Sequence, residues 1–60
     1  MKKYLIKVLN KKSSLYDYLL GCGQKISNDV FLAFLTEDQI RNINIIYQDE
    51  FIIISIDEAN

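Results

Sequence analysis

Residues 35–43, which read LTEDQIRNI, constrain the fold more than any other segment because they lie between two apolar runs. Thr36 can accept a hydrogen bond from the amide of Gln39, and the Gln39 side chain can bond back to the amide of Thr36. This spacing is typical of a capping box, which marks the start of a helix. The apolar runs on either side, 30–35 and 51–56, have the length of strands. The segment therefore predicts a strand, a capped helix and another strand.

The first predicted strand covers residues 3–9, where apolar side chains alternate between two sides. Tyr4, Ile6 and Val8 share one side, which we assign to the core. A turn over residues 10–13 follows this strand.

A first helix is predicted after the turn because Leu15, Leu19 and Cys22 recur at helical spacing, with Tyr18 alongside. We interpret Cys22 as a small core residue at the helix end. The helix has two candidate N-caps and two candidate stops: Ser13 or Ser14, and Gly21 or Gly23.

The end of the second helix has two interpretations because β-branched Ile43, Ile45 and Ile46 suit a strand as well as a helix. In the first, the helix continues to about Ile46 and the last strand covers residues 51–56. In the second, a strand starts at Ile45 and forms a hairpin through residues 48–50. We prefer the first.

A weak strand over residues 24–27 completes the order strand, helix, strand, strand, helix, strand. This order predicts an α+β, ferredoxin-like βαββαβ fold, with an antiparallel four-stranded sheet and two helices on one face. The 60 residues contain no linker or repeat, so a single domain over 1–60 is expected.

The sheet is predicted to be apolar on both faces, although its helices can cover only one. We assign one alternating set to the helix side: Tyr4, Ile6, Val8, Val30, Leu32, Phe34, Ile52, Ile54 and Ile56. The other set is then the exposed face: Leu5, Leu9, Phe31, Ala33, Leu35, Phe51 and Ile53. A contiguous exposed apolar patch marks an interface. A protein partner or a second copy of the chain is therefore expected to dock there.

Charge and composition argue against several function classes. The net charge is −1, and the lysines lie at or before Lys25 without arginine clustering or a stacking platform, so nucleic-acid binding is not expected. The chain has no histidine and one cysteine, so we expect no enzyme, no cofactor, no metal site and no internal disulfide. Lys7 interrupts the N-terminal apolar run, which argues against a signal peptide and a membrane span. A cytoplasmic protein is expected unless the chain is a processed fragment.

The order of elements, together with the phrase LTEDQI at residues 35–40, resembles the propeptides of subtilisin-like serine proteases and related small peptidase inhibitors. In that family a similar Leu-Thr-Glu-Glu-Gln phrase precedes a helix and a strand that ends in paired acids. The pattern extends over nearly the whole chain, whereas its sequence-specific part is this one phrase.

The resemblance implies an intramolecular chaperone and inhibitor that docks its sheet on a subtilisin-like protease domain. The family's closing acids accept hydrogen bonds at the N-termini of protease helices. Asp57 and Glu58 are the counterparts implied here, with Asp49 and Glu50 as the alternative if the last strand begins at Ile45.

The resemblance also implies that the C-terminal tail lies in the substrate cleft like a bound product. That tail would be Asp57, Glu58, Ala59 and Asn60, with Asn60 immediately before the cleaved bond. Asp57 is a departure, because many subtilisin-like enzymes favour an apolar residue four places before the cut. The alternative function is a small ferredoxin-like structural or regulatory protein that self-associates through the same sheet face.

Overall fold

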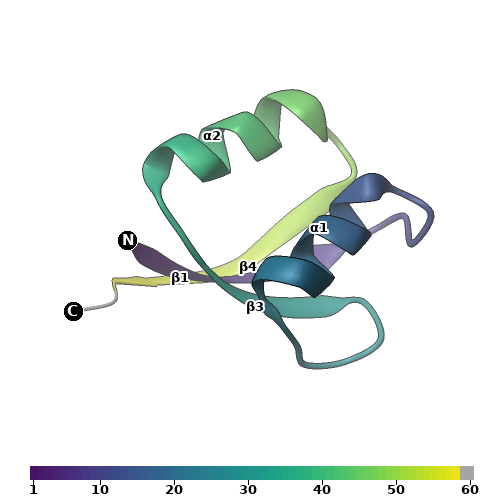
Figure 1. The fold of residues 1–60 in the computed structure, drawn as a ribbon, viewed down its shortest axis with the longest axis horizontal. Helices are drawn as coiled ribbons and strands as arrows, with labels where there is room; N and C mark the ends of the chain where they lie inside the picture. The colour runs from purple at the N-terminus through teal and green to yellow at the C-terminus, as the bar shows by residue number, and fades with distance from the viewer. Residues whose placement is uncertain (59–60) are drawn as a thin grey trace.

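The structure is a computed structural model that describes residues 1–58. Its elements follow one another along the chain: β1 (Lys2–Val8), α1 (Ser14–Cys22), β2 (Gln24–Lys25), β3 (Val30–Leu35), α2 (Glu37–Ile46) and β4 (Phe51–Glu58). The strands form one antiparallel sheet in the order β2-β3-β1-β4, and both helices lie on the same side of it (Figure 1). The prediction of an α+β, ferredoxin-like βαββαβ arrangement is confirmed.

One serine and one glycine set the limits of α1. The Ser13 hydroxyl accepts a hydrogen bond from the Leu15 amide at 3.2 Å, so Ser13 is the N-cap. Gly23 ends the helix, and its amide donates to the Leu19 carbonyl at 2.8 Å. The core assignment of Cys22 is wrong, since this side chain is exposed. It is the last residue of α1, and Leu15 and Leu19 are the buried residues of that helix.

The capping box at the start of α2 is confirmed in both directions. The Gln39 amide donates to Thr36 Oγ1 at 3.1 Å, and the Thr36 amide donates to Gln39 Oε1 at 2.9 Å. The helix ends at Ile46 and the last strand starts at Phe51, as the first interpretation predicted. The alternative strand from Ile45 is wrong.

The register between β1 and β3 overturns the predicted face assignment. Tyr4 pairs with Ala33 and Ile6 pairs with Phe31, and directly paired residues share a face of the sheet. Phe31, Ala33 and Leu35 therefore belong to the core under the helices, where each is almost fully buried: the core residues are Tyr4, Ile6, Val8, Leu15, Leu19, Phe31, Ala33, Leu35 and Ile43. Alternation separates the two sides of a strand, but the pairing decides which side is covered.

The same inversion affects the first part of β4, where Phe51 and Ile53 pack against the core. A β-bulge then changes the alternation, because Ile53 pairs with Ile6 whereas Ser55 pairs with the preceding residue, Leu5. After the bulge, Ile56 returns to the helix side of the sheet opposite Tyr4.

Neither α1 nor α2 has the length and apolar character needed to cross a membrane.

Candidate functional site

We define the open face as the side of the sheet opposite the helices. The register places Lys3 beside Phe34, Leu5 beside Leu32, and Lys7 between Val30 and Ile52 on this side. Ile54 is the extra residue of the bulge. It follows Ile53, which packs against the core, and so lies on the open face. The apolar part of the open face is Leu5, Val30, Leu32, Phe34, Ile52 and Ile54. Phe34, Ile52 and Ile54 remain about half exposed, at 51%, 50% and 51%.

An apolar second face was predicted, but from the wrong residues. Only Leu5 of the strand residues expected on it lies on the open face. Five of the predicted docking residues contact the core instead: Phe31, Ala33, Leu35, Phe51 and Ile53. Leu9 follows the end of β1 and is exposed. The open face consists largely of β3 and β4 side chains that had been assigned to the core, because both strands are apolar on either side.

Two ion pairs lie at the margins of the open face. Lys3 Nζ is 3.8 Å from Asp57 Oδ2, and Lys7 Nζ is 3.9 Å from Asp29 Oδ2. All four side chains are partly exposed, so each pair contributes little to stability. Their effect is to offset the charge of both lysines, which leaves the face nearly neutral.

The residues of the expected tail lie only partly within the described structure. Asp57 pairs with Lys3 near the end of β4, and the backbone of Glu58 pairs with Lys2. Ala59 and Asn60 lie outside the described residues. The start of β1 and the end of β4 lie at the same end of the sheet (Figure 1), since Lys2 pairs with Glu58.

The alternative acids lie at the other end of β4. Asp49 and Glu50 belong to the turn between α2 and β4, where Asp49 has a φ of 66°. The Glu50 carbonyl accepts a hydrogen bond from the Leu9 amide at 2.8 Å. These acids therefore cannot act together with Asp57 at one end of the strand.

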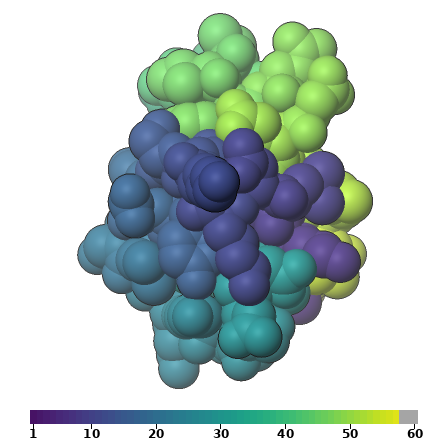
Figure 2. Space-filling view, turned by 90° about the vertical axis from the view of Figure 1, so that its right-hand side faces the viewer, coloured from purple at the N-terminus to yellow at the C-terminus, as the bar shows by residue number. Residues whose placement is uncertain are grey.

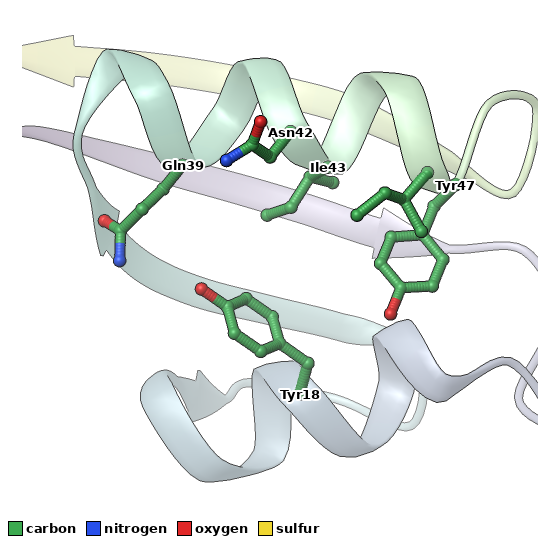
Figure 3. Close-up of a pocket in the computed structure, with 6 residues that line it drawn as sticks. Tyr18, Gln39, Asn42, Ile43 and Tyr47 are labelled. Atoms are coloured by element: carbon green, nitrogen blue, oxygen red, sulfur yellow. The ribbon is translucent and has the colours of Figure 1, made fainter.

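A groove between the two helices was not predicted. It has a volume of about 220 Å³ and is lined by Tyr18, Gln39, Asn42, Ile43, Ile46 and Tyr47. Tyr18 points from α1 toward α2, and Tyr47 points from α2 toward α1 (Figure 3). Tyr47 Oη lies 2.8 Å from Ser14 Oγ and so closes one end of the groove. The helical spacing of these side chains was visible in the sequence, but the separation of the helices was not.

The groove exists because α2 is attached to the sheet by few side chains. Ile43 is its one buried residue in the described structure, whereas Ile45 and Ile46 are 71% and 66% exposed. Figure 2 shows the end of α2 and the following turn, in green to yellow-green, rising above the rest of the molecule. Burial, followed by the neighbouring Cys22, raises the pKa of Tyr18 above its ordinary value.

The open face is lined by apolar side chains, and the groove is lined by tyrosine, amide and isoleucine side chains. Among residues 1–58, no group of three or more histidine, cysteine or acidic side chains could hold a metal ion. The open face presents the larger apolar set, and its margin includes Asp57 from the predicted tail. In comparisons with known proteins, no family model, curated protein or solved structure matches the chain.

Proposed function

We propose that this chain is a propeptide-like module that binds a subtilisin-like serine protease domain. The open face docks on the protease, and the chain beyond β4 enters the substrate cleft. The observation that carries the proposal is the open face itself, where Phe34, Ile52 and Ile54 are half exposed on a ferredoxin-like sheet. The phrase at residues 35–40, which resembles that of the protease propeptides, indicates the class of partner.

Docking on this face would supply a useful amount of free energy. Burying an apolar patch of about 300 Å² at about 25 cal/mol per Å² contributes roughly 7 kcal/mol before the costs of association. Because a 60-residue chain buries a small share of its surface on folding, such binding would also stabilise its fold. The same contact would thus support both binding to the protease and folding of this chain.

Asp57 is the acid best placed to meet the partner. Its carboxylate lies at the margin of the open face, and its ion pair with Lys3 is long and exposed. Exchanging this weak pair for backbone amides at a helix N-terminus of the protease would cost little. Glu58, Ala59 and Asn60 complete the proposed tail.

Inhibition of subtilisin-like proteases tests the proposal. Residues 1–60 are titrated into a panel of such enzymes while hydrolysis of a small peptide substrate is followed. We expect inhibition by the full chain, and weaker inhibition when residues 57–60 are deleted. Phe34→Lys on the open face should weaken inhibition by about tenfold or more, since it buries a charge at the contact.

Ile45→Lys is the matched control, because it adds the same charge at an exposed site on α2. It should inhibit like the unchanged chain. The proposal fails if no enzyme of the panel is inhibited, or if Phe34→Lys and Ile45→Lys inhibit equally well.

Self-association is the second candidate, and the near neutrality of the open face favours it. With Lys3 and Lys7 paired inside one chain, two open faces could stack without bringing like charges together. Sedimentation over a wide concentration range distinguishes the two functions. A dimer that Phe34→Lys converts to a monomer, without any protease inhibition, would support the second candidate.

A further inference from the structure

The two edges of the sheet are built differently. β2 forms one edge, spans only Gln24–Lys25 and includes a lysine. β4 forms the other edge, has 8 residues, and has β1 as its one neighbouring strand in the described structure. A short charged edge resists pairing with another strand, whereas a long apolar edge offers free backbone groups to one. Strand addition is therefore favoured at β4.

The residue types along β4 suit an added strand. Residues 51–56 read FIIISI, carry no charge and are mostly β-branched or aromatic. Ile52, Ile54 and Ile56 are each about half exposed, so an added strand would find apolar surface on both faces of the sheet. Within residues 51–56, the bulge at Ile54 is the one protective device on this edge.

Acidic residues lie at both ends of this strand and argue against a second copy. Asp49 and Glu50 precede β4, and Asp57 and Glu58 end it. An antiparallel pairing that aligns the uncharged runs 51–56 of two β4 strands would place Glu50 opposite Asp57. A parallel pairing in register would place each acid opposite itself. Like charges opposite one another destabilise strand pairs, so both of these self-pairings bring like charges together at two or more positions.

We propose that the outer edge of β4 accepts an extended segment of a partner protein as a fifth strand. The segment has an apolar middle, which extends the two faces, and a lysine or arginine at each end, which meets the acids. Its affinity comes from main-chain hydrogen bonds, and its selection comes from the terminal charges. The edge shares Ile52, Ile54 and Asp57 with the open face, but the binding comes from the outer backbone groups of β4, so the inference does not depend on the proposed protease.

Two blocked synthetic peptides test the proposal on the full chain. One is Lys-Val-Thr-Val-Thr-Val-Lys, and the other has glutamate in place of both lysines. Binding is followed by amide resonances and hydrogen exchange of the isotope-labelled chain. We expect the lysine peptide to slow hydrogen exchange in β4 and to bind about tenfold more tightly than the glutamate peptide. Its affinity should fall as salt is added.

Two variants of the chain locate the binding. Ile56→Lys introduces a charge on the β4 edge, at a half-exposed site on the helix side of the sheet. It should lower the affinity for the lysine peptide about tenfold. Phe34→Lys, the matched control on β3, should leave peptide binding unchanged, although we expect it to weaken protease inhibition. Equal binding of both peptides, protection outside β4, or dimerisation of the chain through β4 would overturn the inference.

Discussion

Gly23 lies where the end of α1 passes closest to the sheet. A Cβ atom at this position would be 2.7 Å from the Leu32 carbonyl oxygen and 3.2 Å from Ala33 Cβ. At Gly21, two residues earlier, a Cβ atom would meet nothing within 4 Å. Gly23 therefore permits a close approach, whereas Gly21 only weakens the helix.

Alanine at these two positions should have opposite effects. Gly23→Ala is expected to lower the free energy of unfolding by about 1–3 kcal/mol, because the backbone of β3 must move. Gly21→Ala should raise it by about 0.5–1 kcal/mol through helix propensity. Urea unfolding followed by circular dichroism measures both changes. Equal stability of the two variants would contradict the close approach.

Tyr18 couples stability to alkaline pH. Burial raises the pKa of its phenol above 10.0, so the folded state favours the neutral form. The resulting stabilisation is complete at a pH below the pKa of Tyr18 in the unfolded chain. It is lost as the pH rises through the pKa of Tyr18 in the folded chain. Tyr18→Phe should therefore make the decline in unfolding free energy above pH 10 shallower. A variant whose pH profile runs parallel to that of the unchanged chain would show that Tyr18 is not responsible.

The capping box should matter at the scale of the α2 element because this helix has few other anchors. Thr36→Ala removes the acceptor for the Gln39 amide and is expected to cost about 1 kcal/mol. Thr36→Ser keeps the hydroxyl and is the control. Urea midpoints of the two variants should separate clearly, and identical midpoints would mean that the cap contributes nothing.

Each helix shows how far local sequence determines an element. The capping box predicted the start of α2 because both of its hydrogen bonds join residues three positions apart. The Ser13 cap and the Gly23 stop were among the sequence alternatives for the same reason. The bulge in β4 gave no such local sign, since it depends on where the strand pairs with β1.

Two phenylalanines of β3 test the orientation of the whole sheet. Phe31 is fully buried, and its ring meets that of Tyr16 edge-on at 5.1 Å, whereas Phe34 is 51% exposed. Phe31→Ala should cost about 3–5 kcal/mol, which approaches the total stability of a domain this small. Phe34→Ala should change the unfolding free energy by less than about 1 kcal/mol. Thermal unfolding measures both losses of stability. A larger loss for Phe34→Ala than for Phe31→Ala would mean that the open face is on the other side of the sheet.

The sequence by itself determined the order of elements, the start of α2 and the presence of apolar side chains on both sides of the strands. These features follow from contacts within a few residues or from simple periodicity. The tertiary structure alone decided which side of β3 and β4 is covered, where β4 bulges, and how far α2 stands from α1. Those features depend on the pairing of segments distant in the chain, and alternation is the same for either face.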